Sequence, residues 1–520
     1  IGVIKKLDII IQIINIILLS LNIKLTKYYF FGGSGTDYWT HLRMNEMLSQ
    51  LGNIGFLIDK EQYFPIMHIN VAIAQIVSSL SIKDASMFSI TIPLIISSVC
   101  VYLIGRELFS ENIGLLGMLI VNISDYHNSW GVAPQTTSYG VIIFFYLMFA
   151  LYKIMQDKNK IEILIITLIL MFTMIAAHAI SSFILLMAIT GLKAGSLIYN
   201  LIFFKKRKFF APMLLLIYSI GLIQHWFIAD YREGGNSFFN QIFGSLTEYI
   251  IEKADFLNRP EAFLDYKEFL PPLSENLVNN LGLALLIFLA AIGSLFWLSS
   301  KFRSEETFSI LVCATLLLCI TLIFPLFGLR NIIPFRWFVF EYLFLGIMAA
   351  FATIQIAKRM NKNQQIFVIF VLFTCLSFFM LTSALNNHAN QDSPLWLKEY
   401  TISPTYTVQE IKGAETISRY SDKVFSDLGY GGSILEDYYG IQHSTFNSMD
   451  LSNRIGDIFI WREYMVDRPI RMFTLIEGYY KRVVKNVILG SGYKEELELM
   501  HDKIYENDEA SGYYIHGVNN

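Results

Sequence analysis

Long apolar runs recur along most of this chain, and they limit its possible folds more than any other feature of the sequence. The first, LDIIIQIINIILLSLNI at residues 7–23, is followed by others of similar length between short charged or Gly- and Pro-rich stretches. A helix needs roughly 20 mostly apolar residues to cross a bilayer. We therefore predict about eleven transmembrane helices, near residues 7–23, 85–105, 112–124, 136–154, 161–178, 182–204, 210–229, 279–300, 307–327, 331–357 and 364–385.

The composition argues against two broad classes of protein. The 520 residues are 54% hydrophobic and only 16% charged, whereas soluble domains carry about a quarter charged residues. A formal net charge of −3 and the lack of a basic stripe argue against a nucleic-acid partner. The cysteines Cys100, Cys313, Cys319 and Cys375 all lie inside apolar runs, which predicts buried thiols and no disulfide framework.

Basic residues collect in alternate turns between the predicted helices, and they predict the orientation. Because positive charge stays on the cytoplasmic side, we place these turns and the N-terminus in the cytoplasm. Loops 24–84, 125–135 and 229–278, and everything after residue 385, are then extracytoplasmic. The apolar stretch at 64–82 would reverse every later basic turn if it crossed, so we predict a helix at the membrane interface there.

The pattern changes near residue 386, where mixed polar sequence with short strand-like runs and Gly turns begins. Residues 386–520 are therefore predicted to form a soluble α/β domain on the outer face, of ordinary domain size. Residues 1–385 are predicted to form a polytopic α-helical membrane domain.

Ionisable residues gather at the predicted outer ends of the helices, where such groups are costly and therefore suggest function. The candidates are Asp37, Asp125, His127, His178, Glu248, Arg330 and Arg336. Acids with a histidine suit a divalent cation, with Mg²⁺ or Mn²⁺ favoured over Zn²⁺. Arginines grip phosphate oxygens, and a lipid carrier would bring a phosphate to that depth. The pattern predicts sugar transfer from a lipid phosphate.

Each candidate also has a simpler explanation, and His178, like His225, could be a histidine at a helix end with its hydrogen bonds satisfied. Asp37 could cap the helix that follows it, and Asp125 with His127 could lie in a solvated loop. Glu248 could be a surface acid of an amphipathic helix. Arg336 could anchor a helix at the interface, as Arg330 could.

In this order along the chain, the candidates resemble the GT-C superfamily of membrane glycosyltransferases, and most closely the archaeal oligosaccharyltransferase catalytic subunit. The motifs that carry the resemblance are DYW at Asp37, DYH at 125–127 and SLTE, which ends at Glu248. The resemblance implies that Asp37 is catalytic and that Asp37, Asp125, His127 and Glu248 surround one metal ion. It also implies a polyprenyl-phosphate-linked donor and an acceptor protein or glycan.

The chain departs from that family in its C-terminal part. The family carries Trp-Trp-Asp-Tyr-Gly there, whereas this chain has FSDLGYGGSI at 425–434, without the tryptophan pair. Two alternatives to the oligosaccharyltransferase-like function therefore stay open. One is a GT-C enzyme that takes a single sugar from a polyprenyl monophosphate; the other is a degenerate GT-C scaffold that binds a partner.

Overall fold

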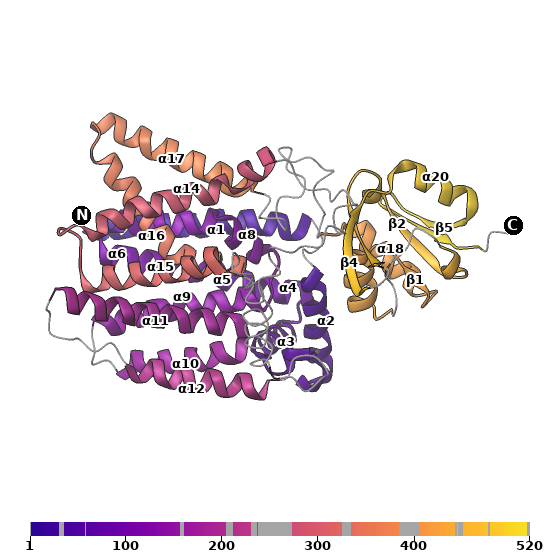
Figure 1. Cartoon of the computed structure of the whole chain (residues 1–520), viewed down its shortest axis with the longest axis horizontal. Coiled ribbons are helices and arrows are strands. Elements are labelled where there is room, and N and C mark those ends of the chain that lie inside the picture. Colours follow the sequence, from indigo (N-terminus) through magenta and orange to yellow (C-terminus); the bar gives the residue numbers. More distant parts are fainter. Residues whose placement is uncertain are drawn as a thin grey trace. The chain divides into compact units, whose positions relative to one another are not determined.

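The structure is a computed structural model of the chain (Figure 1). It describes residues 2–30, 36–57, 59–156, 161–203, 212–229, 237, 273–324, 334–383, 405–441, 445, 451–476 and 479–516. The chain forms two compact units. The first, here the helical unit, comprises Ile1–Ile23, Met47–Pro260 and Asn280–Leu381. The second, here the C-terminal unit, comprises Lys24–Glu46, Glu261–Asn279 and Thr382–Asn520. The predicted domain boundary at residue 385 leaves residues 24–46 with the membrane helices, whereas the structure groups them with the C-terminal residues.

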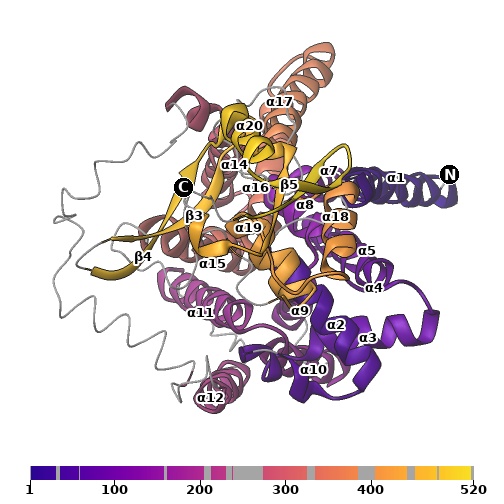
Figure 2. The same cartoon turned by 90° about the vertical axis from the view of Figure 1, so that its right-hand side faces the viewer.

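The helical unit is built from apolar helices, several of which run side by side in Figure 1 and are seen from one end in Figure 2. Its helices are α1 (Gly2–Phe30), α3 (Ile66–Ser78), α4 (Ile82–Ser86), η3 (Met87–Thr91), α5 (Ile92–Ser97), α6 (Val99–Leu108), α7 (Glu111–Ile123), α8 (Asp125–Val132), α9 (Thr136–Gln156), α10 (Ile161–Ala177), α11 (Ala179–Ile202), α12 (Pro212–Ile228), α14 (Leu273–Leu298), α15 (Glu305–Ile323), η6 (Pro334–Trp337), α16 (Phe338–Ala357) and α17 (Lys362–Thr382). Helix α2 (Thr36–Leu51) contributes to both units, as α1 does.

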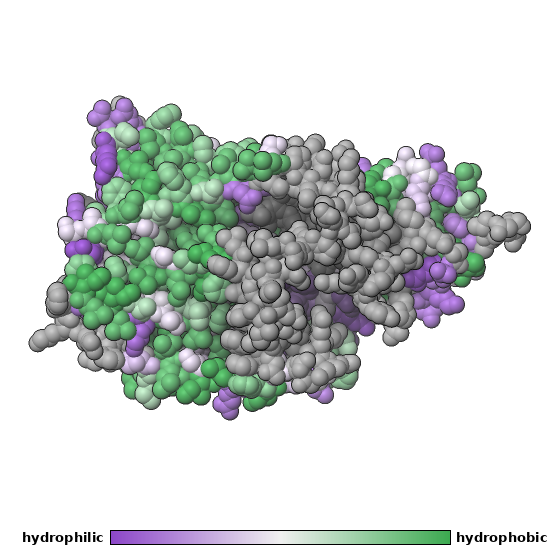
Figure 3. Space-filling model, in the orientation of Figure 1, coloured by the Kyte–Doolittle hydropathy of each residue, from purple (hydrophilic) through white to green (hydrophobic). Residues whose placement is uncertain are grey.

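Eight helices among the described residues are long and apolar enough to cross a membrane. Three of the predicted spans, near 112–124, 161–178 and 210–229, are instead shorter apolar helices, so the count of eleven stays a prediction. The stretch at 64–82 forms α3, which has 13 residues. Figure 3 shows mostly hydrophobic residues on the visible flank of the helices. The protein is an integral membrane protein.

Helix α16 lies at the centre of the helical unit, and α1 and α17 lie at its edge. In the apolar stretch of α16, 83% of residues are buried within the protein, against 11% in α1 and in α17. The exposed faces of α1 and α17 are apolar, as a lipid-facing surface requires. For the same reason the predicted burial of all four cysteines is wrong: Cys100 and Cys313 are buried, but Cys319 and Cys375 are exposed.

Two of the described basic residues contact the end of a neighbouring helix. Lys153, near the end of α9, donates to both carboxylate oxygens of Glu107 in α6, at 2.5 and 2.7 Å. Arg303, just before α15, lies over the ring of Phe203 after α11, 4.0 Å from its centroid. These contacts bring the ends of α6 and α9 together and the ends of α11 and α15 together. The predicted orientation of the basic turns in the membrane stays a prediction.

The C-terminal unit contains a small mixed sheet with the strand order β1-β2-β6-β5. Its elements are α18 (Val408–Ser418), β1 (Val424–Phe425), α19 (Leu428–Tyr430), η9 (Gly431–Tyr438), β2 (Ile458–Arg462), β3 (Ile470–Ile476), β4 (Tyr479–Val487), α20 (Gly490–Met500), β5 (Asp502–Glu506) and β6 (Ala510–Tyr514). β1 and β2 are parallel, whereas β6 runs antiparallel to both of its neighbours. β3 and β4 form a separate antiparallel pair. The predicted mixture of helices and strands is confirmed.

Candidate functional site

The DYH motif begins a short helix that lies wholly inside the helical unit. Helix α7 ends at Ile123, and Ser124 adopts an extended conformation (ψ 143°) before α8 starts at Asp125. Every residue of α8 is buried. The simpler explanation for Asp125 and His127, a solvated loop, is therefore wrong.

Asp125 is held by hydrogen bonds from two helices. Its Oδ1 accepts from the backbone N–H of Tyr126 at 2.7 Å and from the hydroxyl of Tyr342 in α16. The Tyr126 ring stacks on Phe338 of α16, with centroids 5.6 Å apart. Because buried carboxylates need such donors, α16 fixes the orientation of Asp125. Sequence analysis did not identify Tyr342, although a tyrosine next to an acid in an apolar run was a signal.

His127 and Arg336 contact other parts of the same region. The His127 imidazole stacks on Phe145 of α9, with centroids 6.5 Å apart and ring planes within 17°. The Arg336 guanidinium in η6 lies 5.4 Å from the centroid of the Trp130 ring in α8. The structure therefore brings Asp125, His127 and Arg336 together around α8, whereas joint metal binding by Asp125 and His127 stays a prediction.

The two helix-end histidines have different surroundings. His178 is buried before α11, where its Nδ1 lies 2.7 Å from Ser181 Oγ and accepts from the Ser181 N–H at 3.3 Å. This contact caps α11 and gives His178 a structural role. Its predicted contact with a phosphate stays a prediction. His225 Nε2 lies 3.0 Å from the carbonyl oxygen of Tyr63 and ties the end of α12 to the segment before α3.

An ionisable pair that sequence analysis missed lies beside α3. His68 Nε2 is 3.5 Å from Glu61 Oε2, and both side chains are buried. These residues belong to the first predicted outer loop. A histidine three positions after Pro65, which follows the buried Phe64, was the available signal.

Asp37 lies in the C-terminal unit, in the first turn of α2, and is exposed. The positive end of a helix dipole favours an ionised carboxylate there. Its neighbours Tyr38 and Trp39 are buried, and the Tyr38 hydroxyl lies 2.8 Å from that of Tyr28. The DYW motif thus points an acid outward while its aromatic pair anchors the helix.

Three side chains of α2 hold it to the C-terminal residues of the same unit. Thr40 Oγ1 donates to Asp437 Oδ2, and Arg43 donates to the backbone oxygen of Tyr438. The Trp39 ring lies 5.1 Å from that of Tyr438. The helix that carries Asp37 is therefore fixed to η9 by contacts that span almost 400 residues of sequence.

Asp437 is an acid in this contact whose pKa is raised. Burial raises the pKa of its carboxyl, and the nearby Glu436 and Asp37 carboxylates raise it further, against the Thr40 hydrogen bond and Arg43. Asp437 was not among the sequence candidates. The acids near Asp37 therefore include a second carboxylate from the C-terminal residues.

The acid of the FSDLGYGGSI stretch has a structural role. Asp427 is 3% exposed, and its Oδ1 accepts from the N–H groups of Gly429 and Tyr430. Its Oδ2 accepts from Arg462 Nη1 at 2.9 Å. Arg462 also donates to Glu410 at 2.7 Å, so Asp427 is part of a buried ion network.

Glu248 and Arg330 lie outside the described residues, and their predicted roles stay predictions. Asp37 and Asp125 belong to different units, and their convergence on one metal also stays a prediction.

Solved structures with low sequence identity to this chain resemble it in fold. The archaeal oligosaccharyltransferase AglB from Archaeoglobus fulgidus, in complex with an inhibitory peptide and a dolichol-phosphate, is 12% identical with a TM-score of 0.50. That match covers 84% of this chain and 64% of the other. An oligosaccharyltransferase from Archaeoglobus fulgidus in complex with Zn and sulfate is also 12% identical, with a TM-score of 0.50 and coverages of 82% of this chain and 61% of the other. The fold of this chain is therefore similar to that of the oligosaccharyltransferase.

The match to AglB in the peptide complex covers 64% of the length of AglB. ArnT from Cupriavidus metallidurans, bound to undecaprenyl phosphate, is 11% identical with a TM-score of 0.46 over 91% of this chain and 97% of that one. No protein-family model and no curated protein matches the sequence.

Proposed function

We propose that this protein is a membrane glycosyltransferase that moves a sugar or glycan from a polyprenyl-phosphate-linked donor to an acceptor. The observation that supports this most is Asp125. It is a fully buried carboxylate whose orientation is fixed by Tyr126 and Tyr342 at one end of a GT-C-type helical unit. A carboxylate buried at the edge of a membrane is costly and suggests function.

Asp37 is assigned the catalytic role in this proposal. The acceptor would give up a proton to Asp37 while its nucleophilic atom bonds to the anomeric carbon of the sugar. The bond from that carbon to the phosphate oxygen breaks, the phosphate leaves with the electron pair, and the anomeric configuration inverts. The exposed position of Asp37 at the start of α2 suits contact with an acceptor.

The candidates would stabilise the departing phosphate in two ways, through a metal ion and through direct contacts. Asp37, Asp125, His127 and Glu248 would hold a divalent metal ion, which fits the carboxylate-rich donor set. When bound, such an ion supplies Lewis-acid stabilisation of the leaving phosphate. Arg330, Arg336 and His178 would contact phosphate oxygens, since guanidinium groups bind them in a bidentate manner.

A second candidate function differs from the first in its donor and its acceptor. Asp427 stands where the family has the acid of its acceptor-recognition motif, but here Arg462 and two backbone N–H groups bind it. This favours an acceptor other than an asparagine sequon. A single sugar passed from a polyprenyl monophosphate to a protein, lipid or glycan fits this observation.

Carboxamide variants of the two acids test the proposal. In purified protein in lipid, we expect Asp37→Asn and Asp125→Asn to lower transfer from a labelled polyprenyl-linked sugar by about 100-fold or more. Tyr342→Phe, which removes the donor to Asp125, should cost about tenfold, as loss of a group that orients a ligand does. Asp422→Asn, at an exposed acid of the C-terminal unit, is the matched control and should keep full activity.

Two measurements distinguish the two candidate functions: which donor the protein uses, and whether a chelator stops the transfer. Transfer from a diphosphate-linked donor that stops on chelation supports the oligosaccharyltransferase-like reaction. Chelator-resistant transfer from a monophosphate-linked donor supports the second candidate. Transfer that survives Asp37→Asn unchanged would contradict the assignment of the catalytic base.

A further inference from the structure

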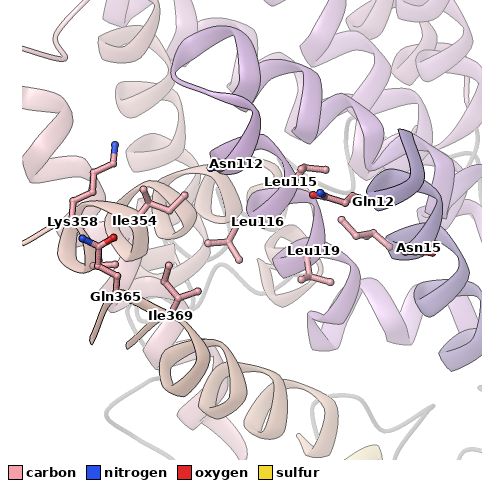
Figure 4. A pocket seen from close by; sticks show the side chains of 12 residues that line it. Gln12, Asn15, Asn112, Leu115, Leu116, Leu119, Ile354, Lys358, Gln365 and Ile369 are labelled. Atoms are coloured by element: carbon pink, nitrogen blue, oxygen red, sulfur yellow. The ribbon is translucent and has the colours of Figure 1, made fainter. Parts of the chain in front are cut away.

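A cavity of about 580 Å³ lies in the helical unit between α1, α7, α16 and α17. Figure 4 shows side chains of these four helices around it. It lies at the end of the unit that carries the basic turns, because Lys358 follows the last residue of α16 and Asn112 lies in the first turn of α7. Asp125 follows the opposite end of α7, so about 20 Å of helix separates Asn112, at the polar end of the cavity, from Asp125, and about 9 Å separates Leu119 from it.

Apart from Asn15, which lies about 4–5 Å further along α1 than Gln12, the lining of the cavity changes from polar to apolar along the helices. Asn112, Lys358 and Gln365 lie at helix ends. Leu119 lies seven residues after Asn112, and Ile369 four residues after Gln365, so they lie roughly 10 and 6 Å deeper. This order matches the boundary between the headgroups and the acyl chains of a bilayer leaflet.

The charge of the lining favours an anion at the polar end. Lys358 is the one charged side chain among the 12 that line the cavity, and it is exposed. The carboxamides of Gln12, Asn112 and Gln365 add N–H donors. An ammonium group with amide donors suits a phosphate group, and lysines beside a bilayer attract anionic lipids.

The position of the cavity favours lipid over protein as the occupant. Both α1 and α17 are lipid-facing, with 11% of their apolar stretches buried within the protein. An apolar cavity between two such helices is in contact with the acyl chains of the bilayer, and hydrocarbon fills apolar space more favourably than water does.

We propose that this cavity binds one anionic phospholipid of the leaflet on the basic side. Its phosphate contacts Lys358 and the carboxamides, and one acyl chain lies along Leu116, Leu119 and Ile369. The lipid joins the peripheral helices α1 and α17 to the central α16, which carries Tyr342. This site is separate from the glycosyltransferase site proposed above and does not depend on it.

Native mass spectrometry of the full-length protein tests the site. The protein is equilibrated with phosphatidylglycerol and phosphatidylcholine of identical acyl chains. We expect wild-type protein to retain phosphatidylglycerol about fivefold better, which is the effect of one lysine at an anionic surface. Lys358→Gln should abolish that preference. Lys301→Gln, on a basic turn outside the cavity, is the matched control and should keep it.

Larger side chains in the apolar part of the cavity test the acyl-chain contact independently, through the retention of both lipids. Leu116→Trp should lower retention of both lipids, and Ile369→Phe serves as a milder second variant if Leu116→Trp does not fold. Equal retention of the two lipids by wild type, or an unchanged preference in Lys358→Gln, would overturn the proposal. So would unchanged retention in Ile369→Phe, or a protein found in place of the lipid.

Discussion

Arg462 shows how a single residue organises the C-terminal unit. It is 1% exposed, donates to Glu410 and Asp427, and lies 4.6 Å from the centroid of the Tyr464 ring. Burial lowers the pKa of Arg462, but the two carboxylates outweigh burial and hold it above its usual value. Breaking a buried ion pair by removing one partner is costly, because the other charges stay buried without compensation.

We therefore expect Arg462→Met to destabilise the protein by about 3–5 kcal/mol. The measurement is the thermal unfolding midpoint of the detergent-solubilised protein. Neutralising the partners in the triple variant Arg462→Met, Glu410→Gln and Asp427→Asn should recover part of the loss. Arg419→Met is the control, since the Arg419–Glu415 pair is exposed and worth at most about 1 kcal/mol. A loss no larger than that of the control would contradict the role of Arg462.

At the scale of elements, small residues decide which membrane helices pack closely. Gly191 and Gly195 form a GxxxG pattern on α11 and face α15. A Cβ on Gly191 would lie 2.7 Å from Cys313 Cα, and one on Gly195 would lie 2.6 Å from Ser309 Cα. Helices in lipid associate through such close backbone approach, because lipid leaves little hydrophobic driving force between them.

Gly191→Ala should consequently separate α11 from α15 and destabilise the protein by about 1–3 kcal/mol. The unfolding midpoint again reports the change. Gly221→Ala on α12 is the matched control, because the nearest atom is the mobile Ile175 Cδ1 at 3.3 Å. An alanine there should be neutral or stabilising, as it usually is in a helix. Equal midpoints for the two variants would refute close packing through Gly191.

For the whole molecule, the basic turns predict which side of the membrane each part occupies. The contacts of Lys153 and Arg303 place basic turns at one end of the helical unit. The candidate residues around α8 lie at the other end of α7 and α9. With positive charge inside and an odd number of crossings, the C-terminal unit should be extracytoplasmic.

Cysteine labelling tests this orientation. In protein without its native thiols, a membrane-impermeant maleimide should label Lys301→Cys only from the cytoplasmic side. It should label Asp422→Cys only from the outer side. Both positions are exposed. Labelling of both from the same side would show that the number of crossings between residues 301 and 422 is even, and it would contradict the predicted extracytoplasmic position of the C-terminal unit.

Much of the fold follows from the sequence, because a bilayer requires long apolar helices and keeps charge at their ends. The runs at 7–23 and 364–385 predict α1 and α17, and the acids and histidines at helix ends predict the end of the unit where Asp125 lies. Which side chain contacts which was decided only by the tertiary structure. Tyr342 meets Asp125 across 217 positions, and Thr40 meets Asp437 across 397. Such pairs form when packing brings distant helices together, and no local period or spacing in the sequence encodes them.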